Sequence, residues 1–224
     1  MFQLGTRPPA PPGLSAALEG LRGVGTATLG HITDFGFAQG VQPLFRPAKA
    51  VGRACTAHIP RVDGSAVHYA LGVIEPGEVL VIDTTGETGR ACVGGGVAYA
   101  AARAGAVGIV VDGPATDWEE LKELGLPVWC RGITSLTTHG LALEGAVQMP
   151  VRIGEAVVHP GDIVFADSDG VYFLAPADVA GIVETLRERE ARWAGVQRRL
   201  DAGEKLPDIN GTRAKLDGLR GPHR

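Results

Sequence analysis

The stretch from Val79 to Gly113 constrains the fold of this chain more than any other part of it. It contains a short apolar run ending in Asp83, a glycine-rich segment, an alanine-rich run, and a second short apolar run ending in Asp112. Short apolar runs bounded by turn residues are typical of buried strands, and the alanine-rich run between them is typical of a helix. A strand, a helix and a strand in this order form a crossover, so we expect two parallel, neighbouring strands. Asp83 and Asp112 should then lie at the carboxyl edge, where sheets of this kind bind ligands.

The patterns on either side of this crossover add a strand-rich layer. We expect helices over 14–23, from Thr26 or Thr28 to about Gly36, over 65–71 and over 118–125, and a long charged helix over 177–203. We expect strands over 49–59 and 126–132, and an all-β region over 148–174 with turns at Pro160-Gly161 and Asp169-Gly170. Together these predict an α/β fold with a mixed sheet and one βαβ crossover, with a doubly wound nucleotide-binding fold as the alternative. We expect an N-terminal arm over 1–13, one domain over 14–203 including the C-terminal helix, and a tail over 204–224 that is disordered or crosses onto a partner subunit.

Composition excludes several classes of protein. The net charge of −4 gives no general attraction to nucleic acid, and no apolar run approaches the ~20 residues of a membrane helix. The N-terminus lacks the pattern of a signal peptide, so we expect a cytoplasmic protein that binds neither nucleic acid nor membrane. Three separated cysteines without a C-x-x-C pair indicate reduced, buried thiols rather than zinc ligands or disulfides: Cys55, Cys92 and Cys130.

Three successive glycines, Gly94 to Gly96, precede the alanine-rich helix. Backbone amides at such a position point away from the helix at the positive end of its dipole, and they suit a carboxylate or a phosphate. The spacing does not match a dinucleotide fingerprint, and no P-loop lysine follows, so a small carboxylate is the favoured anion. The alternative is that the glycines only allow the strand and the helix to pack closely.

The acidic residues after the second strand have two competing interpretations. Asp117 is placed to cap the helix that begins with Trp118, and Glu119 and Glu120 suit a solvated first turn. A carboxylate facing a glycine-rich anion site also suits Mg²⁺, which needs only one or two protein carboxylates. On local grounds the two roles of Asp117 are equally supported.

Two further side chains remain candidates. Arg131 follows the strand over 126–132 and could bind a carboxylate through both of its outer nitrogens, although an exposed arginine is common at such a place. His31 lies in a glycine-bounded helix, and no pair of histidines has the spacing of a metal site. The sequence contains no G-x-S-x-G motif, and no lysine ends a convincing apolar strand, which disfavours serine hydrolases and Schiff-base aldolases.

Taken together, these residues resemble the family of the regulator of ribonuclease E activity A and the 4-hydroxy-4-methyl-2-oxoglutarate aldolases, some members of which are labelled demethylmenaquinone methyltransferase-like. The resemblance covers about 26–176 and rests on T-A-T-L-G-H-I-T-D at 26–34, G-G-G-V-A-Y-A-A-A-R-A-G-A-V-G-I-V-V-D-G at 94–113, T-D at 116–117, P-V-W-C-R-G at 127–132, and V-H-P-G-D-I-V-F-A-D-S-D-G-V at 158–171. It implies a swivelling β/β/α domain that forms trimers or hexamers with active sites at subunit boundaries.

In the aldolase members, glycine-loop amides hold the pyruvate carboxylate, and an Arg-Asp pair binds the keto acid and a divalent metal. By resemblance, the amides are those of Gly94, Gly95, Gly96 and Val97, and the Mg²⁺ or Mn²⁺ ligand is Asp117. The family's arginine is Thr116 here, its glutamate after the first loop glycine is Gly95, and its early helical aspartate is His31.

These observations support three hypotheses. The first is a metal-dependent lyase that cleaves a 4-hydroxy-2-oxo acid or decarboxylates oxaloacetate, with Asp117 on the metal, Thr116 against the substrate, and Arg131 or His31 replacing the missing arginine. The second is a regulatory binding protein on the same scaffold. The third is a methyltransferase, which is disfavoured because G-P-A-T follows the second strand in place of a glycine-rich cofactor turn.

Overall fold

A computed structural model describes residues 1–219. The chain divides into two units, Met1–Val183 and the segment from Glu184 onward. The predicted boundaries after residues 13 and 203 stay a prediction, although part of the predicted arm, Phe2–Leu4, forms a strand.

The first unit contains all the strands of the described chain. Their bounds are β1 Phe2–Leu4, β2 Gln42–Pro43, β3 Lys49–His58, β4 Val79–Asp83, β5 Gly108–Val111, β6 Val128–Cys130, β7 Gly145–Val147, β8 Val151–Ile153, β9 Ala156–Val158, β10 Ile163–Asp167 and β11 Val171–Leu174. The helices are α1 Leu14–Arg22, α2 Thr26–Gly30, α3 Ser65–Ala70, α4 Gly95–Arg103 and α5 Trp118–Leu124, followed by α6 Val179–Asp201, α7 Leu206–Ile209 and α8 Thr212–Leu219.

The predicted crossover is confirmed, because β4 and β5 are parallel neighbours joined by α4. The structure adds two crossovers of the same kind, since β3 is parallel to β4 across α3 and β5 is parallel to β6 across α5. The main sheet has the order β1-β7-β3-β4-β5-β6-β2, and β2 and β7 make antiparallel contacts. The mixed sheet of an α/β fold is therefore present.

Strand β3 joins the two layers of strands. Its first half, residues 49–53, pairs antiparallel with β10, and its second half, residues 54–58, pairs parallel with β4. Strand β10 in turn pairs with β11. The two turns expected in this region lie between β9 and β10 and between β10 and β11.

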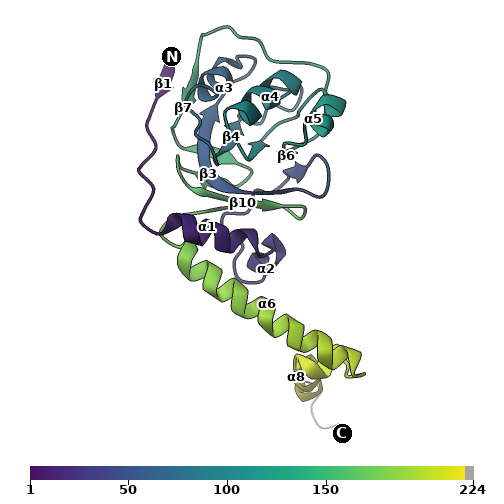
Figure 1. Ribbon diagram of the computed structural model, residues 1–224. Helices are drawn as coiled ribbons and strands as arrows, with labels where there is room; N and C mark the ends of the chain where they lie inside the picture. The colour runs from purple at the N-terminus through teal and green to yellow at the C-terminus, as the bar shows by residue number, and fades with distance from the viewer. Residues whose placement is uncertain (220–224) are drawn as a thin grey trace. The chain divides into compact units, whose positions relative to one another are not determined.

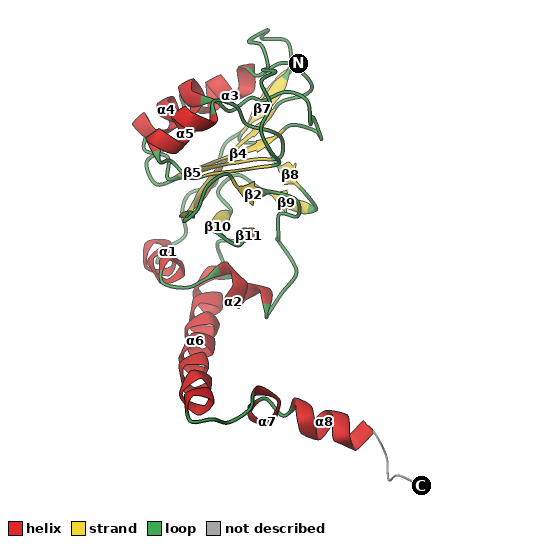
Figure 2. Cartoon of the chain, turned by 90° about the vertical axis from the view of Figure 1, so that its right-hand side faces the viewer, coloured by secondary structure: helices red, strands yellow, loops and turns green. Residues whose placement is uncertain are grey.

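Side chains along the central strands alternate between two buried clusters. Leu80 and Ile82 of β4 pack with the cluster that includes residues of α3, α4 and α5, whereas Val79 and Val81 pack with the cluster formed by β8 to β11. Burial on both faces explains why the central strands are continuously apolar instead of alternating with polar residues. Helices α3, α4 and α5 cover one face of the sheet and β10 and β11 lie on the other (Figures 1 and 2), which excludes the doubly wound alternative.

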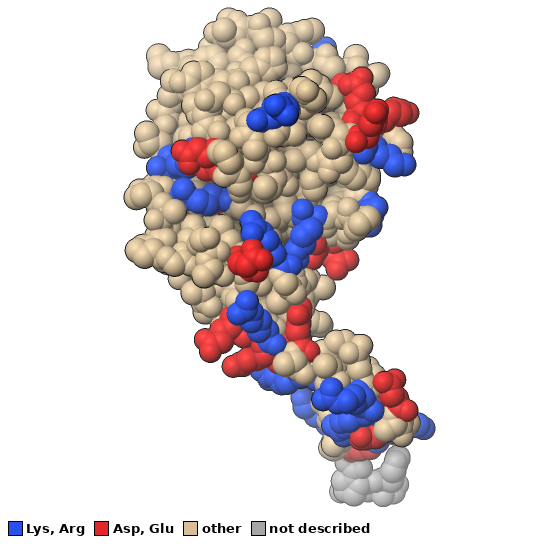
Figure 3. All heavy atoms as spheres, viewed as in Figure 1, with Lys and Arg blue, Asp and Glu red and all other residues tan. Residues whose placement is uncertain are grey.

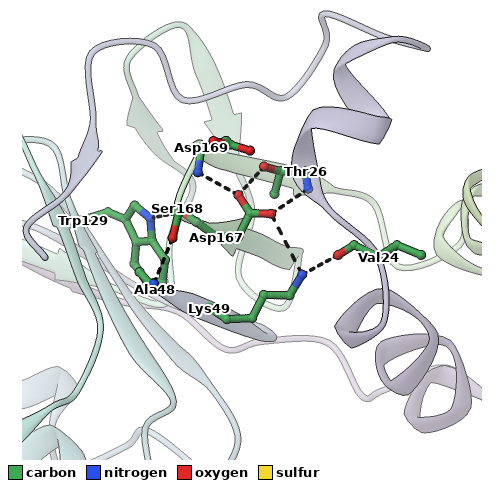
Figure 4. A network of polar contacts seen from close by, with 8 residues as sticks. All are labelled: Val24, Thr26, Ala48, Lys49, Trp129, Asp167, Ser168 and Asp169. Atoms are coloured by element: carbon green, nitrogen blue, oxygen red, sulfur yellow. Dashed lines mark hydrogen bonds and ion pairs between the residues drawn. The ribbon is translucent and has the colours of Figure 1, made fainter. Parts of the chain in front are cut away.

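Helix α2 begins in a way that its sequence did not reveal. A threonine hydroxyl was expected to cap it, but its N-cap is Gly25, and the helix ends at Gly30 rather than near Gly36. The cap comes from β10, because Asp167 accepts hydrogen bonds from the backbone N–H of Thr26 (2.7 Å) and from its hydroxyl (Figure 4). Lys49 and the Trp129 indole, which donates to the Asp167 carbonyl (2.9 Å), complete this polar network. The network ties α1 and α2 to the strand layer.

The second unit is helical and highly charged. The long helix expected over 177–203 is present as α6, and acidic and basic side chains alternate along the C-terminal segment (Figure 3). Within the predicted tail, α7 and α8 are short helices without buried residues, and residues 220–224 lie outside the described chain. No helix within residues 1–219 is long and apolar enough to cross a membrane.

Candidate active site

A groove of about 550 Å³ opens at the N-terminus of α4. It is lined by residues of α3, α4 and three connecting segments: His68, Leu71, Ala91, Cys92, Gly94, Gly96, Val97, Ala100, Thr116, Asp117, Thr137 and Thr138. Five of the predicted site residues therefore meet in one place, although they come from two segments of the chain. We call this the α4 groove.

A small ladder of extended segments builds the floor of the groove. Ala115 forms parallel bridges with Val93 on one side and with Ile133 on the other, and the Thr116 N–H donates to the Val93 carbonyl at 2.9 Å. The chain that leaves β5 is thereby held against the segment that leads into α4. This pairing brings Asp117 next to the glycine loop.

Asp117 caps a different helix from the one expected. It precedes α5 and its side chain makes no capping bond there; instead its Oδ2 accepts the Gly95 N–H of α4 at 3.0 Å. Its Oδ1 accepts the Thr116 hydroxyl at 3.3 Å. The Asp117 backbone is left-handed, with φ of 56°, which is unusual for a residue other than glycine and costs free energy. The carboxylate thus lies at the positive end of the α4 dipole.

The glycines of the loop have different roles. A Cβ at Gly94 would overlap Asp117 Oδ2 and lie 2.7 Å from the Thr116 methyl carbon, and a Cβ at Gly95 would overlap the Glu120 carboxylate. Nothing lies within 4 Å of a Cβ built on Gly96. Gly94 and Gly95 therefore permit close approach of the segment over 116–120, whereas Gly96 is open to the groove. Because the Gly95 N–H is bound to Asp117, the predicted amides left for an anion are those of Gly94, Gly96 and Val97.

Arg131 and His31 do not line the α4 groove. The Arg131 guanidinium forms an ion pair with Asp112 and donates to the Gln39 carbonyl (3.3 Å), and Asp112 is buried and also accepts the Gly154 N–H at 2.9 Å. His31 is an exposed residue at the end of α2. The roles predicted for these two side chains stay a prediction.

His68 and Cys92 also line the groove, although neither was predicted as a site residue. His68 lies on the exposed side of α3, and no spacing motif links it to the glycine loop. Burial raises the pKa of the Cys92 thiol to about 12, so this side chain is a neutral thiol at physiological pH. Among the described lining residues, Asp117 carries the carboxylate and His68 the imidazole.

The donors at the groove fit a hard divalent cation better than a zinc ion. Asp117 is exposed, and the carboxylate of Glu120 lies nearby, against Gly95. Within the described chain, no group of three or more His, Cys, Asp or Glu side chains is arranged to hold a metal ion. Mg²⁺ and Mn²⁺ accept one or two carboxylates and retain water, whereas zinc sites use three or four protein ligands.

Comparison with known proteins agrees with this architecture. A protein from Halalkalibacterium halodurans that is provisionally named as a 4-hydroxy-4-methyl-2-oxoglutarate aldolase is 31% identical over 151 residues, covering 67% of this chain and 71% of the relative. The crystal structure of Streptomyces coelicolor RraAS2, described as an unusual member of the RNase ES inhibitor RraA protein family, superposes with a TM-score of 0.74 at 29% identity. That match covers 84% of this chain and 98% of the other.

A third similar structure carries a different name. The Geobacillus kaustophilus protein described as an S-adenosylmethionine:2-dimethylmenaquinone methyltransferase has a TM-score of 0.62 at 26% identity, covering 67% of this chain and 94% of the other. The family model described as RraA-like, Aldolase/RraA, matches residues 26–173, which include the glycine loop, Asp117 and the β10–β11 hairpin. This chain therefore belongs to the RraA-like family.

Proposed function

We propose that this protein is a divalent-metal-dependent lyase that acts on a 2-oxo acid, by retro-aldol cleavage of a 4-hydroxy-2-oxo acid to pyruvate or by decarboxylation of oxaloacetate. The observation that carries the proposal is the meeting of the α4 amides and the exposed Asp117 carboxylate in one groove. The name of the H. halodurans relative supports the same class of reaction.

The residues of the groove have distinct roles in this proposal. The N–H groups of Gly96 and Val97 bind the substrate carboxylate, and the Thr116 hydroxyl orients the substrate beside it. Asp117 holds Mg²⁺ or Mn²⁺, and its bond to the Gly95 N–H fixes its direction. The ion, when bound, polarises the 2-oxo group and stabilises the negative charge that develops as the carbon–carbon bond breaks.

We also propose that the chain forms a trimer or hexamer with the groove at a subunit boundary. Several large apolar side chains on the loop next to Thr137 and Thr138 are exposed, which supports a protein contact there: Ile133, Leu136, Leu141 and Leu143. Light scattering of the purified protein measures the oligomer directly. A monomer at micromolar concentration would contradict this part of the proposal.

Turnover assays test the activity. Purified protein is incubated with 4-hydroxy-4-methyl-2-oxoglutarate or oxaloacetate and with Mg²⁺, Mn²⁺ or a chelator, and pyruvate release is measured. We expect metal-dependent turnover that falls at least ~100-fold in Asp117→Asn, as is typical when a preorganised electrostatic contact is lost. Glu119→Gln is the matched control, because Glu119 lies two positions further along, in the first turn of α5, and does not line the groove. Absence of turnover with every metal and both substrates would sink the lyase assignment.

Regulatory binding is the second candidate. Thr116 is neutral where the family resemblance places a charged arginine, and S. coelicolor RraAS2 is described as a member of an RNase inhibitor family. If this function holds, the protein slows RNA cleavage by an RNase E-type ribonuclease without any metal or keto acid requirement. Unchanged cleavage rates at a molar excess of the protein would exclude it.

A further inference from the structure

A second cavity, of about 400 Å³, lies where β3 and β4 end and the β8–β9 hairpin packs beside them (Figure 2). Its charged lining residues are His58, Asp83 and Arg152. The rest of its wall is uncharged and is formed by Gln3, Ala146, Met149, Pro150, Val151 and Val157. We call it the hairpin cavity. It shares no lining residue with the α4 groove.

The first cation of the hairpin cavity is the exposed guanidinium of Arg152. Arg152 is the middle residue of β8 and lies opposite Val157 of β9, whose side chain is also exposed. Its backbone N–H donates to Oδ2 of Asp83 at 3.0 Å, which holds this part of β8 at the end of β4. Among residues 1–219, no ion pair or hydrogen bond involves the Arg152 guanidinium. Its charge is therefore accessible to a ligand in the cavity.

The second cation is the imidazole of His58, which is held in place from one side. Its Nδ1 lies 3.5 Å from Oδ2 of Asp83, and the side chain is 32% exposed. Asp83 is itself fixed, because it accepts the backbone N–H of Thr85 at 2.7 Å as well as that of Arg152. A carboxylate on one ring nitrogen sets the orientation of an imidazole and leaves the other nitrogen for a second partner. Nε2 of His58 is thus the atom that can donate to a ligand.

The charges of the lining residues define the ligand. When the imidazole is protonated, Asp83 balances one of the two cations, so the lining carries a single net positive charge. One carboxylate neutralises this charge and accepts from both a guanidinium and an imidazolium. Met149, Val151 and Val157 offer an apolar surface beside them. We propose that the hairpin cavity binds a small monocarboxylate with an apolar body, held by the Arg152 guanidinium and by Nε2 of His58, at a site separate from the α4 groove.

The same geometry makes the binding depend on pH. The hydrogen bond with Asp83 raises the pKa of His58, burial opposes this, and the charges of Asp83 and Glu144 add to the rise. The imidazole is charged below this raised pKa and loses its charge as the pH rises through it, whereas Arg152 stays charged throughout. Affinity for a monocarboxylate is therefore highest at the acidic end of the range and falls as the pH rises.

Calorimetry with the full-length protein and no added metal tests this proposal with three matched probes near pH 6. Benzoate carries the carboxylate and an apolar ring, benzamide lacks the charge, and acetate lacks the ring. We expect benzoate to bind, and each of the other two to bind roughly tenfold or more weakly, because one loses the charged hydrogen bonds and the other the apolar contact. Benzamide that binds as tightly as benzoate, or no benzoate binding at about 10 mM, would overturn the proposal.

Two variants and two controls locate the binding. Arg152→Gln keeps the backbone bond to Asp83 and should weaken benzoate roughly tenfold or more both near pH 6 and near pH 9. The affinity of the parent should fall by roughly tenfold between these two pH values, and His58→Gln should bind weakly at both, without the fall. Arg103→Gln removes an exposed cation at the end of α4, and His68→Gln removes the imidazole of the α4 groove, so both should bind benzoate as the parent does.

Parental affinity in both His58→Gln and Arg152→Gln would overturn the assignment. Loss of benzoate binding in His68→Gln would also overturn it, because the carboxylate would then lie in the α4 groove. None of these measurements depends on turnover, so the hairpin cavity and the lyase proposal can fail independently.

Discussion

At the scale of single residues, Thr116 is the position where this groove departs from the arrangement that the family resemblance implies. Its methyl group lies over Gly94 and its hydroxyl donates to Asp117, so a longer side chain at this position would start at the mouth of the anion site. We expect Thr116→Arg to raise kcat/KM for a 2-oxo acid by about 10- to 100-fold, because a guanidinium pairs with the substrate through two hydrogen bonds. Steady-state kinetics measure this gain. Thr116→Lys, which adds charge without the planar fork, is the control, and a Thr116→Arg enzyme no faster than the parent would contradict the role of this position.

The sequence suggests that Arg131 binds the substrate, but in the structure its guanidinium is paired with Asp112. Its ion pair with the buried Asp112 predicts that Arg131→Met leaves a carboxylate unpaired and lowers the free energy of unfolding by roughly 3 kcal/mol. Urea denaturation measures this loss. Adding Asp112→Asn to the same chain should restore part of the stability. A stable Arg131→Met protein that has lost only turnover would instead favour the catalytic role predicted from the sequence.

At the scale of elements, the sequence predicted strands and helices where the apolar pattern matched one kind of element. The β4 and β5 strands are apolar on both faces, and α4 is rich in alanine, so their type and their parallel pairing could be predicted. Contacts between distant segments could not. Asp167 caps α2 from 141 positions away, and Asp117 caps α4 instead of its own helix. Local sequence rules describe a residue's neighbours along the chain, whereas these partners are set by the tertiary fold.

At the N-terminus of α4, substitution by alanine is expected to have opposite effects on stability at Gly94 and at Gly96. Gly94→Ala places a Cβ against Asp117 and Thr116, so we expect it to break the bond from Gly95 to Asp117, destabilise the protein by about 1 kcal/mol, and abolish turnover. Gly96→Ala adds its Cβ to open space within a helix, so we expect a gain in stability of about 0.5–1 kcal/mol. Thermal denaturation of both variants measures the difference. Equal stability of the two would show that the loop relaxes around the added methyl group.

The ends of β3 and β4 carry an ion pair that predicts a pH dependence. His58 Nδ1 lies 3.5 Å from Asp83 Oδ2, and this contact raises the pKa of His58. Burial would raise the pKa of Asp83, but the hydrogen bonds from His58 and from two backbone N–H groups outweigh it, so the pKa of Asp83 is lowered. The contribution of His58 to the free energy of unfolding is complete below the pKa of about 6.5 that this side chain has in the unfolded chain. It is lost as the pH rises through the raised pKa of the folded state. The Asp83 contribution is present above its unfolded pKa of about 3.9 and is lost as the pH falls through the lowered folded pKa. The pair therefore stabilises the protein most between these two values.

His58→Gln should accordingly lower the free energy of unfolding by roughly 0.5–1 kcal/mol near pH 5, and by much less near pH 9. Urea denaturation across this pH range measures the difference between the variant and the parent. His139→Gln, which changes an exposed histidine on a loop, is the control for the loss of an imidazole. A difference that does not change with pH would show that His58 acts through packing instead of charge.

At the scale of the whole molecule, the first unit contains the α4 groove together with the two buried clusters that stabilise it. The sequence predicted this layered organisation because each layer has its own pattern of apolar residues. It could not predict how the N-terminal segment is held, since that segment has no periodic pattern and its Arg7 pairs with Glu75 and Glu78. Apolar periodicity locates a core, but the sites between segments depend on pairings that periodicity does not encode.

The segment beyond α6 should be dispensable for the fold of the first unit. Helices α7 and α8 bury no residue, and their ion pairs, such as Arg213 with Asp208, are exposed and close along the chain. Exposed pairs contribute little to stability, so we expect a chain ending at residue 203 to unfold within a few degrees of the parent and to keep its turnover. Calorimetry and light scattering on both chains measure stability and oligomer size together. A truncated chain that is stable but assembles into a smaller oligomer would show that the tail crosses onto a partner subunit. A large fall in melting temperature would instead contradict the absence of buried residues in α7 and α8.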